Sequence, residues 1–185
     1  MITKQYLTEK VQNGERISAA EAVEMWRLFE FSELSTLAQI VRFRNNPERN
    51  VTYLIDRNIN YTNVCTFKCK FCGFSKGPLS LNLRGTPYLL TLDDIATRSR
   101  EAADLGATEV CLQGGIHPDF DGNYYIDVAR AVSEAVPEIH IHGFTALEVT
   151  EGARRLDEPL DSYLRRLKDA GLKTLPGTAA EILDD

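Results

Sequence analysis

The chain has 185 residues, a length that fits one domain or one domain with a small appendage. Hydrophobic residues make up 43% and charged residues 26%, as in ordinary globular proteins, and the formal net charge is −6. This acidic balance argues against a surface built to bind nucleic acid phosphates. No stretch approaches the roughly eighteen consecutive apolar residues of a membrane helix, and the N-terminus lacks the apolar segment of a signal peptide, so we expect a cytoplasmic location without membrane contact.

Residues 1–50 are predicted to form a short helical N-terminal extension. Ser18 and Glu21 have the spacing of a capping box, which predicts a helix that begins directly after Ser18. Apolar residues then recur at helical spacing and form a face that we interpret as core packing: Ala19, Ala22, Val23, Trp26 and Phe29. Ser32 is expected to cap a second helix, which stops near the turn signal at residues 45–47.

From residue 51 onward the pattern is one of alternating strands and helices. Strands are predicted at residues 51–55, 59–63, 108–112, 139–142 and 172–175. Helices are predicted at residues 91–105, capped by Thr91, and at 124–136, 146–156 and 160–170, with a new helix starting at 178–183 and a loop over 73–90. This alternation predicts an α/β fold with parallel βαβ units that curl into a partial (βα) barrel of about four units.

The functional site of such a barrel lies at the carboxyl ends of its strands. Because the sequence stops just inside a helix, we expect the core over residues 51–185 to be incomplete at its C-terminus. Three cysteines lie together directly after a predicted strand: Cys65, Cys69 and Cys72, in the pattern CxxxCxxC. Without an export signal, such a cluster favours metal binding over disulfides.

The spacing of the cysteines helps to choose among metals. A structural zinc ion wants four ligands, but no histidine lies near the three cysteines, and Cys111 sits in an apolar run, where we interpret it as a buried small hydrophobe. An iron–sulfur cluster normally takes four cysteines, so three of them would leave one iron open to a substrate or cofactor. Non-catalytic metal binding remains the alternative.

The CxxxCxxC pattern, with Phe71 before the third cysteine, resembles the radical S-adenosylmethionine (SAM) enzymes. The resemblance implies that Cys65, Cys69 and Cys72 hold a [4Fe–4S] cluster whose open iron binds SAM, and that SAM is cleaved to a 5′-deoxyadenosyl radical. It further implies a set of SAM contacts: Phe71 near the adenine, Gln113, Gly114 and Gly115 near the amino group, and Glu181 near the ribose hydroxyls. The alternatives are core packing, a bare turn and a helix-start carboxylate, respectively.

Residues that could touch a substrate or move a proton follow the strand predicted at residues 139–142 or lie on it. We predict His142 and Glu148 as catalytic candidates, with His140 on the same face as His142 because residues two apart on a strand share a face. His117 lies in another strand-end loop and is a further candidate. For each of these residues a structural hydrogen-bonding role is the alternative. Tyr61, Asn60 and Asn63, just before the cysteines, are weaker candidates.

Three longer segments narrow the resemblance: residues 57–65, 109–118 and 175–183. They are similar to a radical SAM subgroup that contains the second subunit of FO synthase and two menaquinone-pathway enzymes, aminofutalosine synthase and cyclic dehypoxanthinyl futalosine synthase. The final segment, "PGTAAEILDD", is most similar to FO synthase, whereas Gly73 stands where alanine is more familiar.

The FO synthase resemblance implies a transferase of deazaflavin biosynthesis. Such an enzyme couples the 4-hydroxybenzyl group of tyrosine to 5-amino-6-(D-ribitylamino)uracil, beside a first-half FO synthase subunit or domain and a reductant protein such as ferredoxin or flavodoxin. A futalosine enzyme of the menaquinone pathway is the second hypothesis, and a non-catalytic metal-binding fragment is the third.

Overall fold

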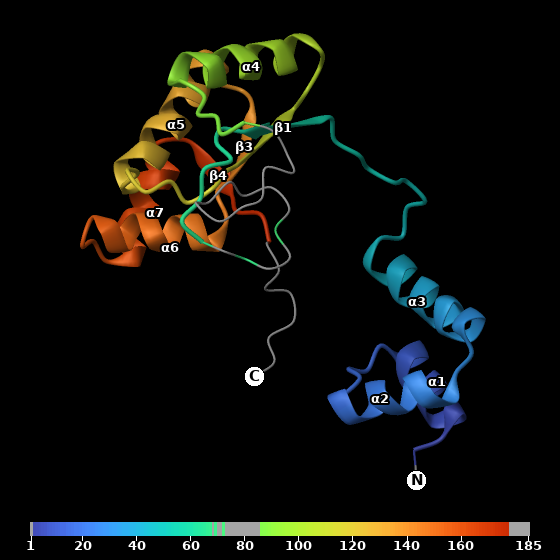
Figure 1. The fold of residues 1–185 in the computed structure, drawn as a ribbon. Coiled ribbons are helices and arrows are strands. Elements are labelled where there is room, and N and C mark those ends of the chain that lie inside the picture. The colour runs from blue at the N-terminus through green and yellow to red at the C-terminus, as the bar shows by residue number, and fades with distance from the viewer. Residues whose placement is uncertain (1, 68, 70–71, 73–85, 178–185) are drawn as a thin grey trace. The chain divides into compact units, whose positions relative to one another are not determined.

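The computed structural model describes residues 2–67, 69, 72 and 86–177. It divides into two compact units, Met1–Tyr53 (the helical unit) and Leu54–Asp185 (the core unit). The helical unit contains α1 (Lys4–Asn13), α2 (Ala19–Leu28) and α3 (Phe31–Asn45) (Figure 1). Within the described ranges, no helix has both the length and the apolar character needed to cross a membrane.

The helical unit confirms one predicted cap and corrects another. Ser18 and Glu21 form the predicted capping box, in which the Glu21 N–H donates to Ser18 Oγ at 3.3 Å and the Ser18 N–H donates to Glu21 Oε2 at 2.8 Å. The helix that Ser32 was expected to cap is α3. It begins at Phe31, so Ser32 lies inside it, and its N-cap is Glu30. The reason is that Glu33 accepts the N–H of Glu30 at 2.8 Å, which fixes the start of the helix earlier.

The interpretation of Trp26 as a core residue is wrong for the helical unit taken by itself. Trp26 is 81% exposed there, whereas the buried side chain of α2 is Glu21. The reason is that α1 supplies polar partners for α2: Lys10 Nζ lies 2.7 Å from Glu21 Oε1, and the Tyr6 hydroxyl donates to the same oxygen at 2.9 Å. A charge-assisted pair thus takes the buried position that the apolar periodicity assigned to the tryptophan.

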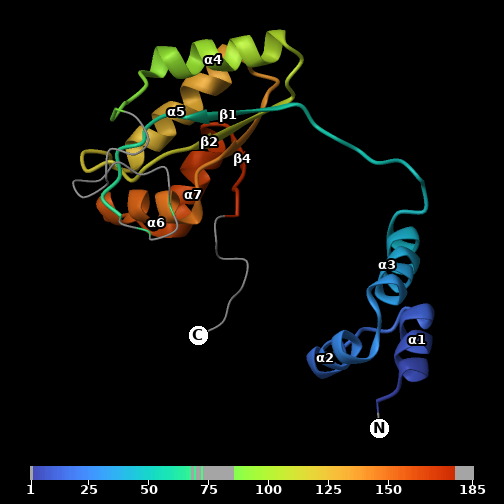
Figure 2. The same cartoon turned by 45° about the vertical axis from the view of Figure 1, so that its right-hand side comes forward.

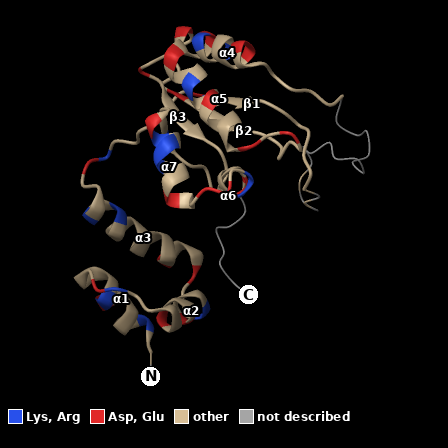
Figure 3. Ribbon diagram, turned by 90° about the vertical axis from the view of Figure 1, so that its left-hand side faces the viewer, with Lys and Arg blue, Asp and Glu red and all other residues tan. Residues whose placement is uncertain are grey.

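The core unit is the predicted α/β layer with a parallel sheet. Its strands are β1 (Asp56–Asn60), β2 (Glu109–Gln113), β3 (His140–Gly143) and β4 (Leu172–Thr174), all parallel and arranged in chain order (Figure 2). Its helices are α4 (Leu92–Asp104), α5 (Gly122–Ala135), α6 (Ala146–Arg155) and α7 (Leu160–Asp169). Acidic and basic residues are mixed along α4, so this helix carries no patch of one sign (Figure 3).

The two faces of the sheet differ in polarity because side chains alternate along each strand. One face is apolar and packs against the four helices through Ile59, Val110, Leu112, Ile141 and Leu172. We call the other face the polar sheet face; its residues are exposed or partly exposed and comprise Asp56, Asn58, Asn60, Glu109, Cys111, Gln113, His140 and His142. A polar surface is therefore available within the core unit to a ligand that approaches the sheet.

The first strand of the core unit differs from the prediction. Residues 51–55 form no strand, and β1 covers Asp56–Asn60 instead of residues 59–63. The reason is the short partner strand: β2 offers five positions, and these pair Asp56 with Glu109 through Asn60 with Gln113. Thr62 instead forms an antiparallel bridge with Leu89. Residues 73–85 of the loop predicted over residues 73–90, and the helix predicted from residue 178, lie outside the described residues.

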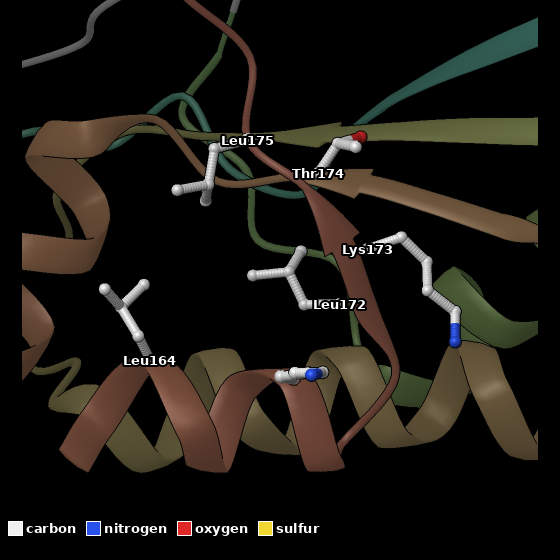
Figure 4. Close-up of a pocket in the computed structure, with 6 residues that line it drawn as sticks. Leu164, Leu172, Lys173, Thr174 and Leu175 are labelled. Carbon is white, nitrogen blue, oxygen red and sulfur yellow. The ribbon is translucent and has the colours of Figure 1, made fainter. Parts of the chain in front are cut away.

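The remaining predicted helices agree with the structure to within two residues. Thr91 caps α4 as expected, since its hydroxyl accepts the N–H of Asp94 at 3.1 Å. The α5 helix starts at Gly122 rather than residue 124 because Asp121 is its N-cap and accepts the N–H of Asn123 at 2.8 Å. An open groove runs beside β4 and is lined by Leu164, Lys168, Leu172, Lys173, Thr174 and Leu175 (Figure 4).

Candidate active site at the carboxyl ends of the strands

The cysteine segment follows β1 directly. Cys65 is partly buried, and its Sγ accepts the backbone N–H of Ile116 at 3.3 Å. Cys69 and Cys72 are exposed, and the N–H of Cys72 donates to the carbonyl of Cys69 at 3.1 Å. Phe71 lies outside the described residues.

The structure does not gather a complete metal site from these thiols. Across the residues that it describes, no group of three or more His, Cys, Asp or Glu side chains is close enough to hold a metal ion. The donor set nevertheless fits an iron–sulfur cluster, because two thiols are accessible and the third already accepts a backbone N–H, as cluster thiolates do. The assignment of Cys65, Cys69 and Cys72 as ligands stays a prediction.

The loop after β2 is bonded to the cysteine segment. The N–H of Gly115 donates to the carbonyl of Thr62 at 3.0 Å, and the N–H of Thr66 donates to the carbonyl of Ile116 at 2.8 Å. Gly115 lies so close that a Cβ there would stand 2.1 Å from the Val64 carbonyl oxygen. The segment predicted to face the SAM amino group therefore lies against the backbone that carries Cys65.

The neighbouring glycine has a similar constraint. A Cβ on Gly114 would stand 2.3 Å from the ring of Tyr61, which is fully buried. Gln113, the third predicted contact, is the last residue of β2 and lies on the polar sheet face. Gln113, Gly114 and Gly115 thus connect the polar sheet face to the cysteine segment.

Glu148 joins the ends of three strands. It lies in the first turn of α6, is fully buried and accepts the hydroxyl of Tyr61, the N–H of Gly114 at 3.0 Å and the N–H of Thr145 at 2.6 Å. Burial raises the pKa of the Glu148 carboxyl, against the opposing effect of these hydrogen bonds. Burial and the neighbouring carboxylate also raise the pKa of Tyr61.

The two histidines of β3 share one face, as predicted, and meet a third residue there. His142 Nδ1 lies 2.6 Å from Thr174 Oγ1, and His140 Nε2 lies 2.8 Å from the same oxygen. Glu109 Oε2 lies 3.7 Å from His140 Nε2. The polar sheet face therefore carries a connected set of groups that can hold and move protons.

Cys111 differs from its interpretation as a buried small hydrophobe. It is only partly buried and stands on the polar sheet face, opposite Asn58 on β1 and His142 on β3. The alternation of β2 explains this, because Val110 and Leu112 take the apolar side. Burial, followed by Asp56 and Glu109, raises the pKa of the Cys111 thiol to about 11.

His117 is held within the loop that follows β2 by contacts of its own. Its ring stacks on Phe120 with centroids 4.4 Å apart, and its Nδ1 accepts the N–H of Asp119 at 3.2 Å. The guanidinium of Arg155 donates to the carbonyls of His117 at 2.6 Å and Pro118 at 3.2 Å. Glu181, the predicted ribose contact, lies outside the described residues.

The sequence prediction missed some partners of the candidate residues. Thr174 carries no signal in the sequence, because nothing in a threonine near a strand end marks it as a bridge between two histidines. The link between Thr145 and Glu148 had a visible signal, since their spacing is that of a capping box. Asn63, a weaker candidate, accepts the N–H of Tyr88 at 2.9 Å and donates to the carbonyl of Thr86 at 3.2 Å, so it holds the returning chain.

A parallel α/β sheet with a CxxxCxxC segment at the carboxyl end of its first strand defines a class of protein. The Radical SAM superfamily model matches residues 59–184, and the chain belongs to this superfamily. Among solved structures, the chain is similar to the FeFe-hydrogenase maturase HydG from Carboxydothermus hydrogenoformans, with a TM-score of 0.64 and 17% identity over 94% of this chain and 47% of that one. It is also similar to methylornithine synthase, with a TM-score of 0.58 and 17% identity over 92% of this chain and 58% of that one.

Curated relatives found by sequence have a higher identity to the chain than these solved structures do. The chain is 49% identical to FO synthase of Streptomyces coelicolor over 136 residues, which is 74% of this chain and 15% of that protein. It is 41% identical over 177 residues to 5-amino-6-(D-ribitylamino)uracil–L-tyrosine 4-hydroxyphenyl transferase of Methanocaldococcus jannaschii, or 91% of this chain and 47% of that one. Cyclic dehypoxanthine futalosine synthase of Halalkalibacterium halodurans is 36% identical over 97% of this chain and 47% of its own length. The chain spans less than half the length of each of these three relatives.

Proposed function

We propose that this chain forms part of a radical SAM transferase of deazaflavin biosynthesis. The reaction would join the 4-hydroxybenzyl group of tyrosine to 5-amino-6-(D-ribitylamino)uracil. The observation that carries the proposal is the 41% identity to the methanogen transferase along 91% of this chain, a stretch that includes the cysteine segment. Tyrosine, the uracil, a first-half FO synthase subunit or domain and a ferredoxin or flavodoxin would be its partners.

Each predicted site residue has a proposed task. Cys65, Cys69 and Cys72 would hold the [4Fe–4S] cluster, and Gln113, Gly114 and Gly115 would receive the SAM amino group, with Phe71 at the adenine and Glu181 at the ribose. When bound, the cluster and SAM would supply a 5′-deoxyadenosyl radical for hydrogen abstraction from tyrosine.

The protein's own contribution is to bind, orient and exchange protons. His142 stands on the polar sheet face, where it could accept or donate a proton at a bound substrate. Glu148 is fully buried and saturated by three donors, which supports a positioning task for it rather than contact with substrate. It would hold the loop of Gly114 in place.

The proposal is tested by anaerobic reconstitution of the full-length protein with iron and sulfide, followed by SAM, tyrosine and the diaminouracil. We expect 5′-deoxyadenosine to form only when both substrates are present. Cys69→Ser should lose the cluster absorbance and the product, whereas the matched control Cys111→Ser should keep the cluster absorbance. A colourless protein that binds zinc and never cleaves SAM would refute the proposal and support a non-catalytic metal-binding role.

A menaquinone-pathway futalosine enzyme is the second candidate, favoured by the 36% identity along 97% of the chain. The same reconstituted protein distinguishes the two functions. If 5′-deoxyadenosine forms with a futalosine-pathway substrate and not with tyrosine and the diaminouracil, the second candidate replaces the first.

A further inference from the structure

The pairing between β3 and β4 is irregular, and the irregularity decides which side chain faces the two histidines. Ile141 stands opposite Leu172, but His142 stands opposite Thr174, so Lys173 has no counterpart on β3. In a regular register His142 would face Lys173. Such bulges are rare in parallel pairs and often re-aim a side chain next to a site.

The extra residue places the Thr174 hydroxyl between two imidazole rings. Its oxygen lies 2.6 Å from His142 Nδ1 and 2.8 Å from His140 Nε2, both within hydrogen-bond range. A hydroxyl has one proton to donate and lone pairs to accept with, so it can donate to one ring while it accepts from the other. The protonation of one ring nitrogen is therefore tied to that of the other.

We propose that Thr174 joins His140 and His142 into a proton relay that takes a proton from a substrate on the polar sheet face. This inference rests on the proposed enzyme function. In the accepting state, His142 carries its proton on Nδ1 and presents a bare Nε2. When Nε2 takes a proton from a substrate hydroxyl or ammonium group, the substrate keeps the electron pair. The Nδ1 proton then passes to the Thr174 oxygen, and the hydroxyl proton of Thr174 passes to His140 Nε2.

One proton enters the relay, and one positive charge appears on His140. Glu109 Oε2 lies 3.7 Å from the nitrogen that receives the proton and stabilises this charge. Asp56 stands opposite Glu109 on β1, and its charge interacts with His142, at the other end of the relay. Cys111, opposite His142, stays a neutral thiol near pH 7, because its pKa is raised to about 11 by burial and the nearby carboxylates. Glu109 thus stabilises, on His140, the proton that enters the relay at His142.

Ring-nitrogen NMR of this chain tests the relay without any turnover. In the wild type we expect the ¹⁵N signals of His140 and His142 to change together over one pH interval, because a proton taken up at one ring is shared with the other. Thr174→Val should separate the two transitions, and Thr174→Ser, which keeps the hydroxyl, should restore the shared one. Lys173→Gln, next to it on β4, should leave the shared transition unchanged (Figure 4). Independent transitions in the wild type would overturn the relay.

Product formation by the reconstituted full-length protein gives the second readout. Thr174→Val should slow product formation by about 100-fold, the scale of lost general acid–base catalysis, while SAM binding is kept, and Thr174→Ser should recover most of the rate. The relay is refuted if product forms while the two histidines show independent transitions, or if Thr174→Val leaves the rate unchanged. Neither result contradicts the proposed function. If the two histidine transitions are coupled but no product forms from tyrosine and the diaminouracil, the proposed function is refuted instead.

Discussion

Glu148 is the residue on which the carboxyl ends of the first three strands converge. A buried carboxylate is costly unless hydrogen bonds replace the water it loses, and here three donors do so: the Tyr61 hydroxyl and the backbone N–H groups of Gly114 and Thr145. Because two of these donors are backbone groups, the carboxylate fixes main-chain positions rather than only side chains. The loop that we propose for SAM binding is therefore held in place by a fully buried side chain.

Glu148→Gln should destabilise the core unit by about 1–3 kcal/mol, the cost of leaving a buried donor unsatisfied. The amide has only one oxygen, so its NH₂ group must face either Thr145 N–H or the donors on the other side. Urea unfolding followed by near-ultraviolet circular dichroism of the buried tyrosines measures the change. Tyr61→Phe removes one donor without adding another, and we expect a smaller loss there. Equal stability of Glu148→Gln and the wild type would contradict the contacts assigned to this carboxylate.

Glu21 makes the stability of the helical unit depend on pH. Its hydrogen bond to Lys10, followed by those to Ser18, lowers the pKa of its carboxyl from the ordinary 4.5 to about 2. A lowered pKa in the folded state means that the stabilisation is complete above about 4.5 and disappears as the pH falls toward about 2. The hydrogen-exchange protection of α1 and α2, measured against the exchange of unstructured peptide at the same pH, should therefore fall over that interval.

Glu21→Gln is the matched variant for this prediction. Glutamine at this position can still serve the capping box with Ser18, but it cannot pair with the Lys10 ammonium. The variant should exchange faster at neutral pH and should lose most of the acid dependence. An unchanged acid dependence in this variant would assign the effect to other carboxylates.

Among the elements, the loop after β2 shows how a close approach constrains sequence. Gly115→Ala would place a methyl group 2.1 Å from the Val64 carbonyl oxygen and 2.9 Å from Cys65 Cβ, so the cysteine segment must shift. We expect a destabilisation of about 1–3 kcal/mol and reduced iron and sulfide content after reconstitution.

Gly106→Ala provides the control for the loop variant. Gly106 has a φ of +86° and open space around it, so alanine there strains the backbone by about 1–2 kcal/mol without touching the site. The control should lose stability but reconstitute its iron and sulfide normally. If both variants load the cluster equally well, the close contact at Gly115 has no bearing on Cys65.

The helices could be predicted from sequence because their ends carry local chemistry. Ser18, Thr91 and the glycine at position 106 act through neighbours three or four residues away, so a window of sequence contains the cause. The ends of β1 could not be predicted in this way, because they are set by pairing with β2, which lies far along the chain. The prediction that Trp26 lies in the core failed for the same reason. Lys10, on α1, pairs with Glu21 and so decides which side chain of α2 is buried.

The candidate site was predictable only in part. The cysteine spacing and the shared face of His140 and His142 follow from the sequence, because spacing and alternation are local properties. The bulge at Lys173 is not visible there, since it exists only as a mismatch between two paired strands. Without it, neither the position of Thr174 nor its link to the histidines could be inferred.

At the scale of the whole molecule, the sheet separates its tasks by face. The apolar face is covered by α4 to α7 and supplies the stability of the core unit, whereas the polar sheet face collects the titratable groups. The strand ends add the cysteine segment, the glycine loop and Glu148 along one edge. Stability and the proposed chemistry can therefore be altered by different substitutions, which makes the variants described above separable.

The order of the strands has a further consequence for how the polypeptide is made. Each strand pairs with the strand that directly precedes it in the chain, so the sheet runs β1-β2-β3-β4. A ribosome delivers segments in this same order, and each newly emerged strand meets a partner that is already available. The core unit can therefore grow from its first strand outward during translation, one strand and one covering helix at a time.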